Sequence, residues 1–181
     1  MPSAIGHAIF ALSLSPFRPY NNKLLLSLIL AMVCSTIPDL DVIGFEAGIR
    51  YGSVWGHRGF SHSILFSLIT GIAVSYLFFN EECETKTDRF LISFFFFTIT
   101  LSHGLLDAMT DGGLGVGFFI PVNNERFFFP IRPIPVSSMH IEAFFTSFGF
   151  SIFKQEMKFI GFVSGLVLLS GYYWRKYFYN K

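Results

Sequence analysis

Four apolar segments constrain the fold of this 181-residue chain more than any other feature. They comprise residues 24–37, 63–79, 90–106 and 159–174 and run from 14 to 17 residues. A transmembrane helix needs about 17–25 apolar residues to cross the hydrocarbon core of a bilayer. Hydrophobic residues make up 52% of the chain and charged residues 14%, with a mean hydropathy of +0.54. This composition is typical of a membrane protein and excludes an ordinary soluble domain.

A fifth apolar segment, residues 3–17, is interrupted only by His7 and scattered serines. It is predicted either to span the membrane or to insert halfway and pack on the other helices. We therefore predict an all-α fold, a polytopic membrane bundle of about four to five transmembrane helices, built as a single domain over residues 1–181. The proline-rich segment 107–158 is expected to form a long loop over one end of the bundle, with residues 141–153 as a candidate helix.

The lysines and arginines set the expected orientation, because cytoplasmic loops carry an excess of both. If the turn at Arg18 and Lys23 is cytoplasmic, seven of these side chains lie inside and six outside. The bias is small. The expected location of the protein is a bacterial inner (plasma) membrane. A net charge of +1 argues against nucleic acid as a partner. The two cysteines, Cys34 and Cys83, form neither a disulfide framework nor a CxxC metal motif.

Ionisable residues gather where the predicted spans end. Polar groups at membrane depth are costly and mark functional sites by default. With the topology above, the N-terminal helix, the "IPDLD" motif, the "HRGFSHS" motif and the "SHGLLD" motif all meet the same, non-cytoplasmic membrane face. The residues concerned are His7, Asp39, Asp41, His57, His62, His103 and Asp107.

These residue types suit a divalent metal. His103 and Asp107 are four residues apart, so their side chains point from one helix face. His57 and His62 are separated by a turn, and Asp39 with Asp41 at an irregular helix end supplies one ligand and one supporting partner. The candidate metal ligands are His7, Asp39, His57, His62, His103 and Asp107. Imidazole and carboxylate without thiolate favour zinc, with manganese or iron as alternatives.

Each motif also has a purely structural explanation. A histidine such as His7 on an apolar helix is often only packed, and "PDLD" is often a helix stop with solvated carboxylates. A hydrogen bond between His103 and Asp107 would satisfy both groups without a metal. The agreement of face, residue type and spacing among the motifs favours a shared metal site.

The motifs "PDLD", "HRGFSHS", "SHGLLDAMTDGG" and "NNERFFFPIRPIPVS", in this order after an N-terminal helical histidine, resemble the YdjM-like family of LexA-regulated, membrane-bound metal-dependent hydrolases. The likeness covers roughly residues 1–139. It implies a membrane-bound hydrolase that depends on a metal.

A more distant likeness is to zinc-dependent phospholipase C and related single-strand nucleases. It implies ligands at His7, at Asp39 or Asp41, at His57 or His62, and at the pair His103 and Asp107, with Asp107 bridging two metals. The third zinc of those enzymes needs further ligands, and here the available residues, Asp111, His140 and Glu142, have a different spacing. The resemblance therefore implies two ions.

A site at the membrane surface makes a lipid or lipid-linked phosphoester the expected substrate. Arg58 is a candidate phosphate clamp because guanidinium binds phosphate through a bidentate fork, although it would equally snorkel to the interface. Asp39, Asp41 and Asp111 are alternative general bases. Two other functions stay open: a metal-ion transporter, and a structural or stress-response membrane protein whose metal site is not catalytic. The oligomeric state stays open as well.

Overall fold

The protein is all-helical in a computed structural model that describes residues 1–20, 22–137 and 141–178. Within these residues the backbone forms no β-strand, only two isolated bridges, Thr110 to Ile134 and Val116 to Phe127. The α-helices are α1 (Ala4–Ser13), α2 (Leu24–Thr36), α3 (Ile64–Phe78), α4 (Lys86–Ala108), α5 (Ile141–Phe144) and α6 (Ser147–Phe178). The 3-10 helices are η1 (Ser15–Phe17), η2 (Ile37–Phe45) and η3 (Phe60–His62).

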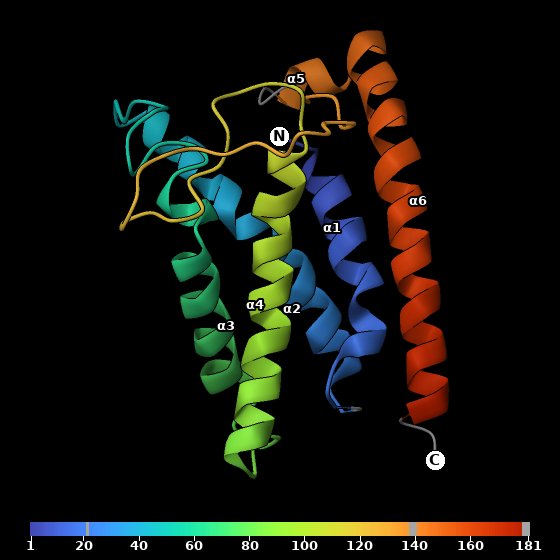
Figure 1. Cartoon of the computed structure of the whole chain (residues 1–181). Coiled ribbons are helices and arrows are strands. Elements are labelled where there is room, and N and C mark those ends of the chain that lie inside the picture. The colour runs from blue at the N-terminus through green and yellow to red at the C-terminus, as the bar shows by residue number, and fades with distance from the viewer. Residues whose placement is uncertain (21, 138–140, 179–181) are drawn as a thin grey trace.

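Helix α4 lies at the centre of the bundle (Figure 1). It contacts α3 on one side and α2 and α1 on the other, and α1 in turn packs against α6. Consecutive long helices run in alternating directions. The end of α4, the start of α1, the helix η2 and the loop after α4 consequently meet at one end of the bundle, the upper end in Figure 1.

Helices α3 and α4 approach each other closely at Gly71. A Cβ atom at this position would lie 2.6 Å from the backbone nitrogen of Phe97 and closer still to the carbonyl oxygen of Ser93. Only glycine permits this distance between the two backbones. Around it, the α1 to α4 core buries ten apolar side chains, with Phe96 and Ile99 on α4 fully enclosed.

Side-chain caps define where two of these helices begin. Thr85 and Asp88 form a capping box, in which each side chain accepts a hydrogen bond from the other's backbone nitrogen, so α4 begins at Lys86 rather than at the predicted residue 90. Ser63 accepts a hydrogen bond from the backbone nitrogen of Phe66 and begins α3 one residue from its predicted start.

The all-helical prediction is confirmed, while the number of transmembrane helices is not. Two helical stretches, Leu24–Phe45 and Lys86–Ala108, are long and apolar enough to cross a membrane, and two shorter apolar helices accompany them, Ala4–Ser13 and Ile64–Phe78. Helix α6 begins at Ser147, inside the candidate helix predicted at 141–153, and continues without a break through the apolar segment at 159–174. The loop predicted over 107–158 therefore ends earlier than expected, because α5 and the polar first three turns of α6 fall within it.

Candidate metal centre

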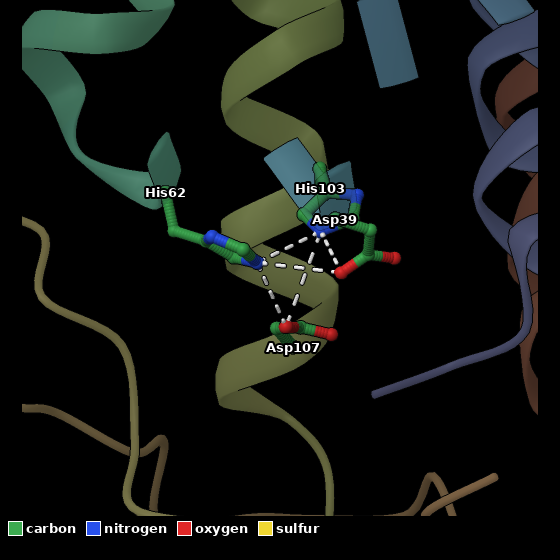
Figure 2. A group of neighbouring side chains, drawn as sticks. All are labelled: Asp39, His62, His103 and Asp107. Atoms are coloured by element: carbon green, nitrogen blue, oxygen red, sulfur yellow. Dashed lines mark hydrogen bonds and ion pairs between the residues drawn. The ribbon is translucent and has the colours of Figure 1, made fainter. Parts of the chain in front are cut away.

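Four side chains meet at the end of α4 that faces the loops (Figure 2). Asp39 comes from η2, His62 from η3, and His103 and Asp107 from α4. One ligand atom from each residue lies within 4.8 Å of the others. The two histidines and Asp107 are fully buried, and the side chain of Asp39 is 12% exposed. We call this group the metal centre.

The local structure explains how these residues reach one another. The spacing of four residues puts His103 and Asp107 on the same face of α4, one turn apart. Between them lies Gly104, where a Cβ atom would be 3.1 Å from the carbonyl oxygen of His62. The absence of a side chain at Gly104 therefore allows η3 to lie against α4.

Hydrogen bonds outside the metal centre orient both imidazoles. Nδ1 of His103 lies 2.6 Å from the carbonyl oxygen of Ser35, an acceptor, so this nitrogen carries the proton. Nδ1 of His62 faces Oγ of Ser61 at 2.9 Å and a carboxylate oxygen of Asp41 at 3.2 Å. Because a neutral imidazole has one donor nitrogen and one acceptor nitrogen, Nε2 of each ring presents a lone pair when that ring is neutral or bound to a metal.

These two lone pairs point at each other across 3.0 Å. Oδ1 of Asp39 lies 3.3 Å from Nε2 of His103 and 3.6 Å from Nε2 of His62, and Oδ2 of Asp107 lies 3.3 Å from the same atom of His62. None of the four carboxylate oxygens of these aspartates accepts a hydrogen bond from a described residue, although all are buried. One oxygen of each aspartate therefore faces the two nitrogens, and Oδ2 of Asp107 also has Nε of Arg58 at 3.0 Å. Two nitrogens with two carboxylates fit a bound cation and suit zinc.

His7 adds a third imidazole beside this group. Its ring stacks on that of His103, with centroids 3.8 Å apart, and its Nε2 lies 3.6 Å from Oδ1 of Asp107. Both ring nitrogens are buried, and neither has a hydrogen-bond partner among the described residues. The two oxygens of Asp107 therefore face different histidines, Oδ1 toward His7 and Oδ2 toward His62.

Asp41 and His57 lie outside the metal centre and contact it through His62. Oδ1 of Asp41 is 2.7 Å from Nδ1 of His57, and Oδ2 accepts hydrogen bonds from Ser61 and from the backbone nitrogen of Arg58. This second group of Asp41, His57 and His62 is also close enough to hold a cation. A carboxylate that receives the outer nitrogen of a ligating histidine is the usual arrangement behind a metal ligand.

The guanidinium of Arg58 is buried beneath the metal centre and is 1% exposed. Nε lies 3.0 Å from Oδ2 of Asp107, and the terminal nitrogens donate to the hydroxyl of Thr110 and the carbonyl of Gly112. The backbone of Arg58 has φ +62°, in the left-handed region. This conformation directs the side chain inward to the loop after α4, so its contacts are with the protein itself.

Competing effects act on the pKa of His62, which lies outside the long helices. Burial lowers this pKa, but the carboxylates of Asp107, Asp39 and Asp41 outweigh the burial and raise it well above its usual value. The surroundings of His62 thus favour positive charge at its Nε2 side, whether from a proton or from a metal ion.

The remaining predicted residues lie apart from the metal centre. Asp111 is exposed, and its carboxylate accepts a hydrogen bond from the backbone nitrogen of Val136 at 2.9 Å. Of the residues considered for a third zinc, Glu142 lies in α5 and His140 is outside the described residues. The guanidinium of Arg126 donates to the carbonyls of His57, Tyr51 and Ser53 and so holds the loop of residues 51–57.

The sequence analysis missed Glu156, a fully buried carboxylate on α6. Its Oε1 accepts hydrogen bonds from the backbone nitrogen and the hydroxyl of Ser3, at 3.0 and 2.8 Å. Ser3 in turn caps α1 by accepting from the nitrogen of Gly6, one residue before His7. An acidic residue next to an apolar helical segment was the available signal, since such residues are rarely buried without a partner.

Comparisons with known proteins place the chain among inner membrane proteins. The family model described as YdjM inner membrane protein matches residues 3–180. The inner membrane protein YbcI of Escherichia coli (strain K12) is 33% identical over 182 residues, covering 97% of this chain and 99% of that protein. No solved structure matches the chain. On the match to the family model and this identity, the chain belongs to the YdjM family of inner membrane proteins.

Proposed function

We propose that the protein is a membrane-bound metal-dependent hydrolase that acts on a lipid or lipid-linked phosphoester at the membrane surface. The observation that carries the proposal is the pair of Nε2 atoms of His62 and His103, which face each other at 3.0 Å beside the buried carboxylates of Asp39 and Asp107. These carboxylates favour positive charge between the two nitrogens, and a bound cation would supply it in place of a proton on His62.

Two ions, most simply zinc, would suit the buried ligand atoms. The first would be held by Asp39, His62, His103 and Asp107, and the second by Asp107 together with His7. The distance of 3.6 Å between His7 and Asp107 leaves room for a shared cation rather than a hydrogen bond. Zinc in such a site activates water near neutral pH and neutralises charge that develops on a phosphoryl group.

The other residues of the site have supporting roles in this proposal. Asp41 and Ser35 hold the two histidines in the tautomers that leave Nε2 free. Arg58 contributes positive charge beside Asp107 and fixes its carboxylate. Asp39 is the most exposed ligand and the proposed side from which substrate enters. As general base we retain the three candidates Asp39, Asp41 and Asp111.

The location supports a lipid substrate. The metal centre lies where α4 ends and α1 begins, at one end of a bundle of apolar helices (Figure 1). We propose that four to five of these helices embed in the inner membrane and that this end faces the non-cytoplasmic side. A phosphoester at the headgroup level of the bilayer would then be close to the metal centre.

One alternative has its own support. The four ligands come from three separate elements and are almost entirely buried, as in a metal site that only fastens helices together. A metal-ion transporter is less well supported, because its ligands are expected near the bilayer midplane on broken helices.

The test is purification of the protein in detergent, quantification of bound metal by mass spectrometry, and a screen of phospholipids and lipid-linked phosphates for hydrolysis. We expect bound metal and activity in the native protein and neither in the double variant His103→Ala, Asp107→Ala. Leu105→Ala is the matched control, since Leu105 lies on the same helix and is 39% exposed, away from the ligands.

Three outcomes separate the alternatives. A native protein without metal, or activity that survives the double variant, would overturn the proposal. Bound metal without hydrolysis of any phosphoester would favour the structural role. Substitution of the metal by cobalt tests the structural role directly. Inorganic phosphate should change the absorption spectrum of a cobalt centre that has an open coordination position, and it should leave the spectrum of a fully coordinated centre unchanged.

A further inference from the structure

A groove of about 490 Å³ lies between η2 and the segment that precedes α3. Sites for small molecules commonly have volumes of roughly 300–1,000 Å³. Most of the lining is apolar. These side chains are Ile37, Leu40, Ile49, Trp55, Phe60 and Phe66.

The polar residues of the groove join it to the metal centre. Asp41 and Ser61 line the groove, and both also contact Nδ1 of His62, at 3.2 and 2.9 Å. His62 presents its other nitrogen to the metal centre. A molecule in the groove therefore lies one side chain away from the proposed ions.

The charge in the groove is already compensated. Asp41 is the charged residue of the lining, and its two oxygens are occupied by His57, Ser61 and the backbone nitrogen of Arg58. The lining thus presents apolar surface and a satisfied carboxylate. It suits an uncharged chain and disfavours an anionic headgroup, which would meet the acidic side chain without a cation.

One wall of the groove is aromatic and leads outward to the bundle surface. The ring of Trp55 lies 5.1 Å from that of Phe60, which lies 6.0 Å from that of Phe66 in the first turn of α3. Trp55 is 65% exposed, and Leu40 opposite is exposed as well. Exposed tryptophan is typical of the level at which lipid chains meet their headgroups.

We propose that this groove binds one hydrocarbon chain of the lipid substrate, while the phosphoester of that lipid lies at the metal centre. The position of the phosphoester rests on the proposed function, whereas the binding of the hydrocarbon chain in the groove does not. The hydrocarbon chain of the lipid contacts the aromatic wall between Trp55 and Phe66, and the lipid headgroup leaves the groove beside Ser61. A substrate with a long chain is then bound more tightly than its water-soluble analogue.

Fluorescence of Trp55 tests the chain site directly. In the variant Trp174→Phe, Trp55 is the sole tryptophan of the 181 residues, which contain two. The protein in dodecyl maltoside micelles is titrated with two probes brominated on a twelve-carbon chain, one with a phosphate headgroup and one with a maltoside headgroup. We expect quenching by the phosphate probe to saturate at a low mole fraction, and chelation to weaken its binding.

A second substitution closes the groove without touching the metal centre. Gly44→Leu places a side chain in the groove, where its Cβ would lie 3.1 Å from Cδ1 and 3.4 Å from Cβ of Ile49, so the Ile49 side chain has to shift by a few tenths of an ångström. Losing the contact of two methylenes is expected to raise the half-quenching mole fraction by about tenfold. Leu101→Phe is the control, because Leu101 lines a separate apolar groove beside Phe118. Metal content verifies the fold of each variant.

The outcomes distinguish this inference from the proposed function. Quenching that rises linearly with mole fraction, or that saturates equally in Gly44→Leu, overturns the chain site. Equal saturable quenching by both probes, unaffected by chelation, supports the chain site and counts against a phosphoester at the metal centre. Cross-linking of a photoreactive residue at position 49 to a second copy of the chain, in place of the probe, also overturns it.

Discussion

His62 and His103 face each other through their Nε2 atoms at 3.0 Å, while Nδ1 of each ring contacts a different partner. The ring of His103 is fixed by the carbonyl of Ser35, at the end of α2, and that of His62 by Asp41 in η2. The polar contacts that surround the metal centre therefore prepare it for a cation before one arrives.

The two histidines of the "HRGFSHS" motif are expected to differ in their effect on metal binding. His62→Ala removes a ligand and should leave the first ion unbound. Asp41→Asn replaces the carboxylate that faces His62, and also His57 and Ser61, while it leaves all the ligands in place, and should weaken binding by roughly 10–100-fold. His57→Ala, one contact further away, should weaken it less than Asp41→Asn. Metal affinity measured by competition with a chromophoric chelator gives the order, and equal losses in all three variants would contradict it.

Arg58→Lys is expected to destabilise the protein despite the retained charge. A single ammonium cannot reach Asp107, Thr110 and Gly112 together, so at least one buried group loses its partner. The cost is about 1–3 kcal/mol per unsatisfied group, and metal affinity should fall with it. Arg132→Lys, at an exposed position, should change stability by no more than about 0.5 kcal/mol. Thermal unfolding in detergent compares the two, and similar midpoints for both would count against this role.

Removal of the metal is expected to lower the thermal midpoint. The ligands join α1, η2, η3 and α4, so the ion stabilises the folded bundle by its binding free energy. At a free metal concentration of 100 times Kd this amounts to about 2.7 kcal/mol, a shift of roughly 5–10 °C for a chain of this size. The midpoint should return when zinc is added back. A midpoint unchanged by chelation, with metal loss verified, would contradict the expectation.

Glu156→Ala is expected to loosen α1 from α6. The substitution leaves the backbone nitrogen and hydroxyl of Ser3 without their acceptor, at a cost of about 1–3 kcal/mol. Because Ser3 caps the helix that carries His7, the second ion should be lost before the first. Glu156→Gln keeps an acceptor oxygen and should retain most stability and both ions. The measurement is the number of metal ions bound per protein molecule. An unchanged number in the alanine variant would exclude a link between Glu156 and the second ion.

The sequence predicted helices better than it predicted side-chain roles. Helix α3 begins and ends within one residue of the apolar segment at 63–79, because its ends coincide with a serine cap and a polar turn. The spacing of His103 and Asp107 correctly placed both on one face of α4, since helical geometry depends on the chain alone. The unbroken course of α6 from Ser147 was missed, because hydropathy excludes the polar residues of its first turns.

The choice between His57 and His62 could not be made from the sequence. It depends on the left-handed backbone at Arg58 and on the turn of η3, which direct His62 toward α4 and His57 toward Asp41. The link between Ser3 and Glu156 spans 153 positions and left no local pattern. Such contacts form only when helices pack against one another. No periodic pattern in a single sequence predicts which side chains then meet.

Helix lengths differ across the bundle. At 1.5 Å per residue the 23 residues of α4 extend about 35 Å, whereas the ten of α1 extend about 15 Å, half of the roughly 30 Å hydrocarbon core. On the proposal that α1 lies in the inner membrane, lipids that reach α1 and η1 between α2 and α6 would meet a protein surface shorter than the hydrocarbon core, and the bilayer would thin or its lipids would tilt there. On that proposal the protein is expected to deform the membrane where α1 faces lipid, and to be sensitive to the acyl-chain length of its host bilayer.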